Sequence, residues 1–360
     1  MRIWQILATI SYGDAVGNDA FAIYHLLKEK GCDTAIYAEG IQPKLRKTKY
    51  IYSIDRLSVL SEDIIIYHLS TGTRLNFLVD KYPCHKILIY HNITPSLFFA
   101  PYNLTMYNYT YSGNEGMKYL ANKVDYCLAD SEFNKKDLIK EGYQCPIDVR
   151  PILIPFHDYE KTPSLDIIKQ YKDGWVNIIF VGRIAPNKKQ EDVIKAFYYY
   201  KNYMNPNSRL ILVGSYEGME KYYERLKNYI SALNVHDVIF TGHIKFEEIL
   251  AYYKIADIFL CMSEHEGFCV PLVEAMYFNV PIIAFRSTAI PDTLSGSGVL
   301  VEDKDPVFIG KLIDQIVSDQ SLRDSIIAKQ KIRLNDFSYE NVSRCFQELL
   351  MKFLERENEK

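Results

Sequence analysis

The chain has 360 residues, of which 48% are hydrophobic and 24% are charged, and its formal net charge at pH 7 is -3. The length predicts two globular domains that each bury a core, and the charge balance gives no global reason to expect a nucleic acid partner. Seven scattered cysteines without a Cys-x-x-Cys pair favour reduced thiols. No apolar run approaches the roughly 18 residues of a membrane-spanning helix, so we expect a cytoplasmic protein.

The chain opens on an apolar β run at residues 3–10 and passes through a glycine loop into a helical pattern at residues 20–30. A strand, a glycine loop and a helix in this order predict the start of a Rossmann-like domain. The loop contains Gly17 and Asn18, but it lacks the Gly-x-Gly-x-x-Gly spacing, and no acidic residue is clearly placed for a ribose. On its own, the loop is a weak indication of a ligand.

Further β segments at residues 34–38, 63–69 and 86–90 extend the predicted sheet, and the last of them runs into His91. Parallel α/β sheets bind ligands at the carboxyl ends of their strands, so His91 is a candidate site residue. A lone histidine at a strand end is more often structural, and from the pattern alone this alternative stays open.

Residues 96–111 are rich in aromatic side chains, namely Phe98, Phe99, Tyr102, Tyr107, Tyr109 and Tyr111. We favour packing in the core as their role, because tyrosine is frequent throughout the chain. The alternative is that these rings line the binding site of a sugar acceptor or face a membrane, since aromatic rings stack on sugars and sit at lipid headgroups.

Three prolines fall within residues 150–164, a stretch without helical periodicity, which predicts an interdomain linker. We therefore expect a first domain at residues 1–155 and a second at residues 165–337. An amphipathic pattern at residues 339–355 predicts a final helix.

The second domain begins with a predicted strand at residues 176–181, which passes into Gly182 and Arg183. Lys188 follows five residues after Arg183, across a turn that contains Pro186, so both cationic heads can converge beyond the strand. Two fixed cations suit a diphosphate, and the arginine fork matches phosphate oxygens. The alternative is a pair of solvated loop charges.

A second strand, at residues 257–262, passes through a glycine turn into a helix predicted to begin at Pro271. Glu266 precedes Gly267 in the turn, and Glu274 lies about one turn inside the helix, facing the same side. Backbone N–H groups and the positive end of the helix dipole suit an anion or a polar ligand here. The alternative is an ordinary helix start with acidic residues near the dipole.

Two more predicted strands, at residues 209–213 and 238–240, also pass into glycine turns, and the second turn contains His243 and Ile244. Further on, Asp305 stands directly before Pro306, which predicts a helix N-cap followed by the first helical residue.

Glu266 and Glu274 resemble the Glu-x7-Glu signature of retaining GT-B glycosyltransferases, in particular family 4 (glycosyl transferases group 1). The segment from His91 to Pro95 resembles the His-Asn-x-Thr-Pro segment of that family, and Gly182-Arg183-x4-Lys188 resembles the motif with which it grips a diphosphate. The resemblance spans nearly the whole chain. One departure is Lys189, which stands where glycine is common and either adds a charge or points to water.

The resemblance implies an α/β protein of the GT-B fold, in which two Rossmann-like domains face each other across a cleft and the C-terminal helix crosses back to the first domain. It also implies roles for individual residues. Arg183 and Lys188 stabilise the diphosphate leaving group, Glu266 bonds sugar hydroxyls or supports positive charge at the anomeric carbon, and Glu274 accepts from the ribose.

By the same resemblance, the expected catalytic residues are His91, which faces the donor sugar, and Arg183, Lys188 and Glu266. The expected donor-binding residues are Gly17, Asn18, Arg183, Lys188, His243, Ile244, Glu266, Gly267, Phe268, Cys269, Val270 and Glu274. We expect no metal and no other cofactor, because the two cations can replace a divalent metal. Asp303-Lys304-Asp305 matches the Asp-x-Asp metal motif of another glycosyltransferase fold, but we interpret it as a turn.

The implied function is transfer, with retention of anomeric configuration, of a sugar from a UDP- or GDP-sugar to a glycan or lipid-linked acceptor. Synthesis of surface polysaccharide or another glycoconjugate is the implied setting, with peripheral contact at the inner face of the membrane left open. Two alternatives remain: a non-catalytic glycosyltransferase-like partner subunit, and another nucleotide-sugar enzyme on the same fold.

Overall fold

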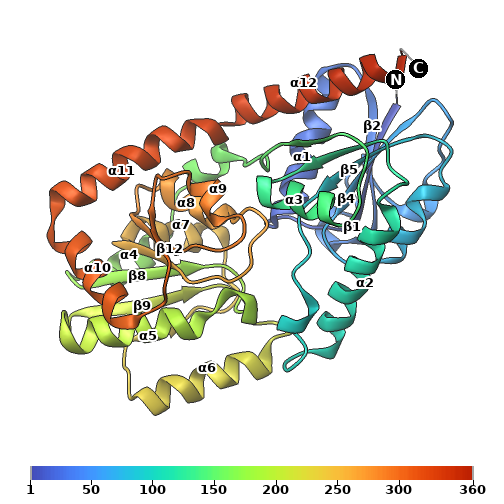
Figure 1. The fold of residues 1–360 in the computed structure, drawn as a ribbon. Helices are drawn as coiled ribbons and strands as arrows, with labels where there is room; N and C mark the ends of the chain where they lie inside the picture. Colours follow the sequence, from blue (N-terminus) through green and yellow to red (C-terminus); the bar gives the residue numbers. More distant parts are fainter. Residues whose placement is uncertain (1, 359–360) are drawn as a thin grey trace. The chain divides into compact units, whose positions relative to one another are not determined.

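The structure is a computed structural model that describes residues 2–358, and it divides into two compact units (Figure 1). Within the described residues, unit 1 contains the chain up to Ser96, Thr105–Phe156 and the chain from Phe337 onward. Unit 2 contains Leu97–Leu104 and His157–Asp336. Each unit is built on a parallel sheet with helices, so the predicted α/β class is confirmed. None of the described helices is long and apolar enough to cross a membrane.

The sheet of unit 1 has the strand order β3-β2-β1-β4-β5-β6-β7, so the chain order reverses between β1 and β4. Its strands are β1 (Arg2–Ile10), β2 (Asp33–Ile41), β3 (Ile51–Ser53), β4 (Ile64–Leu69), β5 (His85–Tyr90), β6 (Tyr126–Ala129) and β7 (Ile147–Val149). The α-helices grouped with it are α1 (Ala15–Glu29), α2 (Leu104–Leu120), α3 (Glu132–Lys140) and α12 (Tyr339–Asn358).

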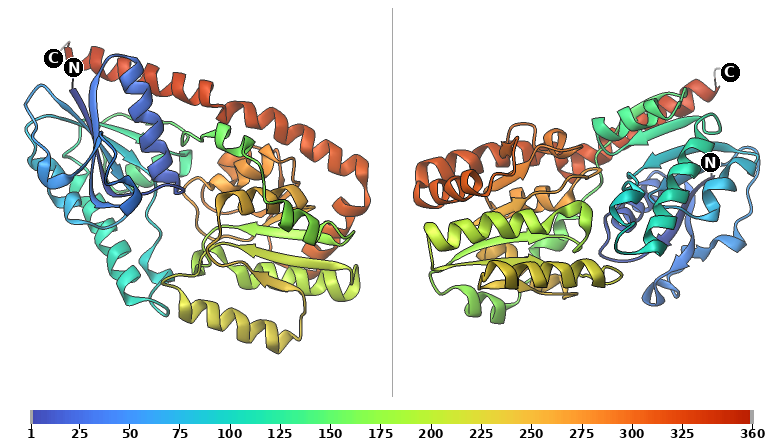
Figure 2. Two further views of the ribbon diagram at one scale, coloured as in Figure 1. Left: turned by 180° about the vertical axis from the view of Figure 1, so that it is seen from behind. Right: turned by 60° about the horizontal axis from the view of Figure 1, so that its bottom comes forward.

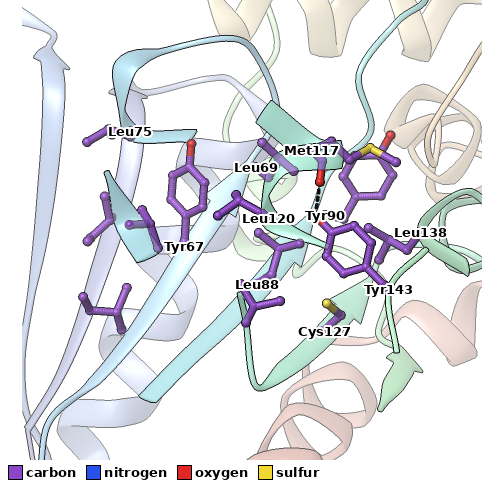
Figure 3. Close-up of a cluster of buried hydrophobic side chains, with 14 of the residues drawn as sticks. Tyr67, Leu69, Leu75, Leu88, Tyr90, Met117, Leu120, Cys127, Leu138 and Tyr143 are labelled. Carbon is purple, nitrogen blue, oxygen red and sulfur yellow. Dashed lines mark hydrogen bonds between the residues drawn. The ribbon is translucent and has the colours of Figure 1, made fainter. Parts of the chain in front are cut away.

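Alternate residues of the central strands point to opposite faces of this sheet, as the pleat requires. Ile64 and Ile66 of β4 join the core that contains residues of α1 and α12. Tyr67 and Leu69 join the other core, with residues of α2 and α3 (Figure 3). The C-terminal helix contributes an apolar stripe of Val342, Phe346, Leu350 and Phe353 to the first core. The predicted return of this helix to the first domain is therefore confirmed.

Unit 2 repeats the arrangement with the order β10-β9-β8-β11-β12-β13, and the near-parallel arrows of each sheet are seen in both views of Figure 2. Its strands are β8 (Val176–Val181), β9 (Ser208–Val213), β10 (Val238–Phe240), β11 (Ile258–Cys261), β12 (Ile282–Phe285) and β13 (Val299–Val301). Its α-helices are α4 (Leu165–Tyr171), α5 (Gln190–Tyr203), α6 (Glu220–Leu233), α7 (Phe246–Ile255), α8 (Val270–Tyr277), α9 (Ile290–Leu294), α10 (Pro306–Ser318) and α11 (Gln320–Leu334). Helix α10 packs beside α5 (Figure 1).

Short 3-10 helices complete both units: η1 (Pro43–Leu45), η2 (Ile54–Arg56), η3 (Arg74–Phe77), η4 (Val79–Lys81), η5 (Ser96–Phe98), η6 (Phe156–Glu160), η7 (Pro186–Lys188) and η8 (Asn335–Phe337).

Helix α1 begins at Ala15, so the prediction of a start at residue 20 is wrong. Asp14 caps the helix, and its carboxylate accepts a hydrogen bond from the N–H of Gly17 at 2.7 Å. This cap outweighs the turn propensity of the Gly-Asn pair that suggested a loop.

The predicted linker at residues 150–164 is only partly a linker, because its beginning is anchored in unit 1. Arg150 is fully buried and forms a bidentate ion pair with Asp19 of α1, at 2.7 and 2.6 Å. The Asp19 carboxylate also accepts from the N–H of Leu153 at 2.8 Å. A buried charge needs such compensation, so this part of the chain is held rather than free.

The aromatic segment at residues 96–111 does not have the single role predicted for it. Phe99 is buried in agreement with core packing, but Tyr109 and Tyr111 are each 52% exposed, so that prediction is wrong for them. Part of the segment, Leu97–Leu104, groups with unit 2 although it falls inside the predicted first domain. There Tyr102 packs edge-on against Tyr222, with ring centroids 5.1 Å apart.

Candidate functional site

The strand order of unit 2 reverses between β8 and β11, which are hydrogen-bonded neighbours. In open α/β sheets the crevice at such a reversal, beyond the carboxyl ends of the strands, is where ligands bind. The loops that leave β8 and β11 begin at this point, and they carry the residues predicted to bind the diphosphate and the sugar.

Two glycines let the loops after β8 and β9 run close together. Gly182 and Gly214 both have positive φ angles, of 146° and 147°. A Cβ on Gly214 would collide with the carbonyl oxygen of Gly182, so a larger residue is excluded there.

Arg183, directly after Gly182, is exposed. Its guanidinium forms no ion pair and no side-chain hydrogen bond among residues 2–358, and only its carbonyl oxygen is engaged, by Gln190. The Arg183 fork therefore keeps its full hydrogen-bonding capacity for a ligand.

Lys188 and Glu266 are paired with each other across the two loops. The Lys188 Nζ lies 2.5 Å from Glu266 Oε2, and the two side chains are 21% and 8% exposed. Burial lowers the pKa of Lys188, but the Glu266 carboxylate outweighs it and the pKa is raised. The sequence assigned these residues to different parts of a donor, whereas the structure brings them into one ion pair.

The loop after β11 is held by hydrogen bonds to its backbone. Asn187 donates its Nδ2 to the carbonyl of His265 at 3.0 Å and accepts from the N–H of Glu264 at 2.8 Å. The N–H of Glu266 donates to Thr288 Oγ1 at 2.9 Å. Sequence reasoning missed Asn187 and Thr288, because a residue that positions the backbone of a distant loop carries no charge pattern or motif of its own.

Helix α8 begins at Val270, one residue before the predicted start, with Cys269 as its N-cap in the left-handed region at φ 71°. Pro271 has no N–H, and the N–H of Leu272 already donates to the carbonyl of Cys269 at 3.0 Å, so an anion at this helix start would be bound by backbone groups before Pro271. The side chains of Phe268 and Cys269 are buried, and any contact with a ligand would be made by their backbone.

Glu274 is oriented by two tyrosines. Tyr253 of α7 donates to one carboxylate oxygen at 2.7 Å, and Tyr159 of η6 donates to the other at 2.9 Å. Burial raises the pKa of Glu274 even though both tyrosine bonds act to lower it. Neither tyrosine was predicted, because nothing in the sequence singles out two of 29 tyrosines.

His243 is exposed and Ile244 half-buried in the turn between β10 and α7. Gly242 in this turn forms a backbone bridge with Gly214, so the turns after β9 and β10 lie together. The carboxyl ends of three neighbouring strands, β10, β9 and β8, thus carry predicted donor-binding residues or their supporting glycines.

Lys189 has a positive φ of 50°, a backbone conformation that favours glycine. Its Nζ lies 3.3 Å from Glu264 Oε2, so it adds a charge that is paired. Lys304 reaches the same carboxylate at 2.9 Å, and Asp305 caps α10 by accepting from Val307 N–H. The predicted helix cap at Asp305 is confirmed.

In unit 1, both ring nitrogens of His91 are engaged within the unit. Its Nδ1 lies 2.8 Å from Asp130 Oδ2 and its Nε2 lies 2.9 Å from His68 Nδ1, and its side chain is 1% exposed. Burial lowers the pKa of His91, yet Asp130 outweighs it and the pKa is raised. A hydrogen bond from His91 to a sugar would therefore require the loss of one of these partners.

The partners of His68 fix which nitrogens carry protons. Gln5 donates its Nε2 to the carbonyl of Ala20 at 3.0 Å, which turns its Oε1 toward His68 Nε2, also at 3.0 Å. His68 must then donate from Nε2 and accept at Nδ1 from His91. Burial holds the pKa of His68 well below its usual range, in agreement with a neutral ring.

Gly17 lies in the first turn of α1 rather than in a loop, with Asn18 after it. A Cβ at Gly17 would collide with the carbonyl oxygen of Ser11, so the glycine allows α1 to start close to the end of β1. This packing accounts for the glycine whether or not a ligand lies near it.

Two groups of metal-ligating side chains have donor atoms within 4.8 Å of one another, Asp19 with His68 and His91, and Cys261 with Glu266 and Cys269. The first is already neutralised by Arg150, which binds Asp19, and the second by Lys188, which binds Glu266. A cation entering either group would have to displace or face an existing one.

Comparison with known proteins shows that the chain is similar to glycosyltransferases. Residues 166–333, just under half of the chain, match the family described as Glycosyl transferases group 1. The chain is 28% identical over 212 residues to an uncharacterised glycosyltransferase of Methanocaldococcus jannaschii, which covers 57% of this chain and 53% of that protein. It is 26% identical over 221 residues to O-antigen chain mannosyltransferase B of Escherichia coli, covering 59% and 57% respectively. The chain thus spans about half the length of these curated relatives.

The structure resembles HepE of Anabaena in complex with UDP and glucose, with a TM-score of 0.76 and 17% identity over 98% of this chain and 100% of that one. This likeness identifies the fold as GT-B, as predicted. The residues that match the glycosyl transferases group 1 family all lie within unit 2.

Proposed function

We propose that this protein is a retaining glycosyltransferase of family 4 that takes its sugar from a nucleotide-diphosphate donor bound in unit 2. The observation that carries the proposal is the ion pair between Lys188 and Glu266, which joins the two loops that leave the adjacent strands β8 and β11, and the first of these loops also carries Arg183. Cations and a carboxylate at a reversal of strand order are the groups that a diphosphate sugar requires.

The donor breaks at the bond between the anomeric carbon and the diphosphate, which gathers negative charge as it leaves. Arg183 binds this leaving group with its unused fork, and Lys188 exchanges Glu266 for a phosphate oxygen. One oriented donor of this kind is worth about 3 to 4 kcal/mol in the transition state. With both cations in place, the reaction proceeds without a divalent metal.

The same exchange prepares Glu266 for its own role. When the diphosphate takes Lys188, the Glu266 carboxylate loses its partner and is left to bond the sugar hydroxyls or the positive charge at the anomeric carbon. Binding of the leaving group and activation of the carboxylate are then one event, because the pair spans both loops.

Glu274 accepts the ribose hydroxyls, with its two oxygens held in place by Tyr253 and Tyr159. Backbone groups at Gly267 to Val270 bind the sugar and phosphate, and those at His243 and Ile244 bind the base. For Gly17, Asn18 and His91 of unit 1, a role in donor binding stays a prediction.

The donor is a UDP- or GDP-sugar, and the acceptor is a glycan or a lipid-linked sugar in surface polysaccharide synthesis. The complex of HepE with UDP and glucose supports a UDP donor, and the O-antigen mannosyltransferase supports a polysaccharide product. If the acceptor is lipid-linked, the protein reaches it at the inner face of a membrane.

Calorimetric titration with UDP, GDP and ADP in EDTA tests the proposal on the wild type, Lys188→Ala and Lys189→Gly. The second variant is a matched control, because it removes the neighbouring charge at a backbone position that suits glycine. We expect micromolar binding of one nucleotide that is lost in Lys188→Ala and kept in Lys189→Gly. Binding of none would favour the non-catalytic partner, and binding only with added magnesium would overturn the metal-independent mechanism.

A further inference from the structure

Two cysteines of unit 2 bring their sulfur atoms together beside the proposed donor site. Cys261 is the last residue of β11, and Cys269 is the N-cap of α8. Their Sγ atoms and a Glu266 oxygen lie within 4.8 Å of one another. Both residues are buried, at 0% and 8% exposure. The proposed transfer reaction uses neither sulfur.

The two sulfurs are close enough that a small shift of the loop between β11 and α8 can bring them to disulfide distance. A disulfide needs an S–S distance of about 2.05 Å, so the sulfurs have at most about 3 Å to close. The backbone between the two residues is fixed by its hydrogen bonds to Asn187 and Thr288, which keeps both side chains in place. The pair therefore differs from scattered thiols, which meet only after unfolding.

The surroundings of the pair favour thiol chemistry over a bound metal ion. Lys188 already holds the carboxylate of the group, at 2.5 Å, and its positive charge opposes a divalent cation. Within the pair, a hydrogen bond from the Cys269 thiol lowers the pKa of Cys261. Cys261 Sγ also lies 3.3 Å from the Ser263 hydroxyl.

We propose that Cys261 and Cys269 form a reversible disulfide site, oxidised by a peroxide or by a small-molecule disulfide. With hydrogen peroxide, the thiolate of one cysteine attacks an oxygen, which gives a sulfenic acid and releases hydroxide. The sulfur of the second cysteine then attacks the sulfenic sulfur and expels its oxygen as water. In total, two thiols and one peroxide give one disulfide and two waters.

The disulfide ties the first turn of α8 to the end of β11, so it moves the N–H groups between Gly267 and Val270. If the proposed function holds, on which this step rests, oxidation weakens nucleotide binding. Reduction by dithiothreitol restores it, because the thiols return to their original positions.

The experiment treats the full chain with hydrogen peroxide or oxidised glutathione and maps the cysteines by mass spectrometry. Trypsin releases residues 255–286 as one peptide that contains both cysteines and no other, since Lys254 and Arg286 flank it. The disulfide lowers the mass of this peptide by 2 Da, because two hydrogens are lost. Cleavage after Glu264 and Glu266 then leaves two fragments that the disulfide still joins. Calorimetry with UDP and GDP is run on the same samples.

Unit 1 provides the control, because Cys127 and Cys145 also lie close together, with their sulfurs 3.5 Å apart. We expect the 255–286 peptide to lose 2 Da and nucleotide affinity to fall at least about tenfold, which is 1.4 kcal/mol. Cys261→Ala should bind nucleotide as the reduced wild type does and resist the oxidant, whereas Cys145→Ser should stay sensitive.

Oxidation of Cys127 and Cys145 without the 2 Da loss in residues 255–286 would overturn the proposal, as would an unchanged affinity in the cross-linked protein. The mass measurement needs no folded variant and no ligand. A reduced protein that binds no nucleotide would contradict the proposed function, while the mass measurement would still decide whether the disulfide forms.

Discussion

The two sheets share one strand order around their central strands, yet they use the polar residues at the ends of these strands differently. In unit 1, His91 is bonded to His68 and Asp130, and Asp19 is bonded to Arg150, all with buried side chains. In unit 2, Arg183 is exposed without an ion-pair partner among the described residues, and the pair of Lys188 and Glu266 lies at the end of two loops.

This difference shows that a charged residue at a strand end is not in itself a sign of function. What separates the two regions is the hydrogen-bonding capacity that remains after the protein's own contacts are made. Unit 1 uses that capacity for its own buried contacts, whereas the Arg183 guanidinium of unit 2 has no such contact among residues 2–358. Variants that affect folding in one region and binding in the other can test this comparison.

The largest expected effect is on the stability of unit 1. Asp19→Ala removes one partner of a buried bidentate pair and leaves Arg150 uncompensated, which should cost about 3 to 5 kcal/mol of unfolding free energy. Urea denaturation measures the loss. Asp55→Ala, which breaks an exposed pair with Arg74, is the control and should cost at most about 1 kcal/mol. Similar losses in both variants would remove the distinction between the regions.

Arg183→Ala should leave stability nearly unchanged, because the side chain is exposed and unpaired among residues 2–358. If the donor binds as proposed, turnover should fall about 100- to 1,000-fold, as expected for the loss of one oriented cation at the leaving group. A nucleotide-release assay measures turnover, and Arg183→Lys should recover only part of it, since an ammonium lacks the fork. Unchanged turnover in Arg183→Ala would contradict the site assignment.

At Glu274, the comparison can be tested through the pH dependence of nucleotide affinity. Its pKa is raised, so its carboxylate takes up a proton at a higher pH than an exposed glutamate, and nucleotide affinity should weaken as the pH falls from neutral toward 4.5. A raised pKa also means that the contribution of this group to folding is fully present below about pH 4.5 and is lost as the pH rises through the higher folded value. Glu274→Gln should therefore abolish the pH dependence of affinity without a loss of stability at neutral pH.

Tyr253→Phe sharpens that test, since it removes one hydrogen bond that lowers the pKa of Glu274. The midpoint of the affinity curve should move to higher pH, and binding at neutral pH should weaken by about 1.5 kcal/mol, the lower end for a hydrogen bond to a charged group. Tyr252→Phe is the matched control in the same helix. Equal midpoints in both variants would argue against the role of Tyr253.

The smallest effect is expected at Lys189, and it should be a gain. Lys189→Gly relieves the positive φ of a side chain, worth about 1 kcal/mol, and loses an ion pair with Glu264 worth less than that. The variant should be slightly more stable in thermal unfolding. A clear loss of stability would mean that the Glu264 pair is stronger than a surface pair.

Local chemistry accounts for most of the fold that could be predicted. The buried strands read as apolar runs, and Asp305 caps a helix where the sequence placed it. The start of α1 could not be predicted from its glycine-rich residues, because the cap by Asp14 decided it. The same holds for the buried role of Arg150, whose partner is 131 residues away.

In the candidate site, the sequence identified the residues that carry charge, and the structure supplied the residues that hold them. Arg183, Lys188 and Glu266 could be predicted because they stand at strand ends in a recognisable spacing. Tyr159, which lies 115 residues before Glu274, and Asn187, which supports only backbone, leave no such pattern. Partners that meet only through the tertiary fold have no local signature in the chain.

The ion pair between Lys188 and Glu266 also bears on which molecules can stay in the site. A ligand that takes Lys188 leaves a nearly buried carboxylate without its counter-charge, and only a ligand that also serves Glu266 avoids this penalty. Inorganic phosphate and spent nucleotide offer the first contact but not the second, so both are at a disadvantage against an intact donor. If the donor binds as proposed, the pair therefore selects against stray anions, and its return after transfer favours release of the spent nucleotide.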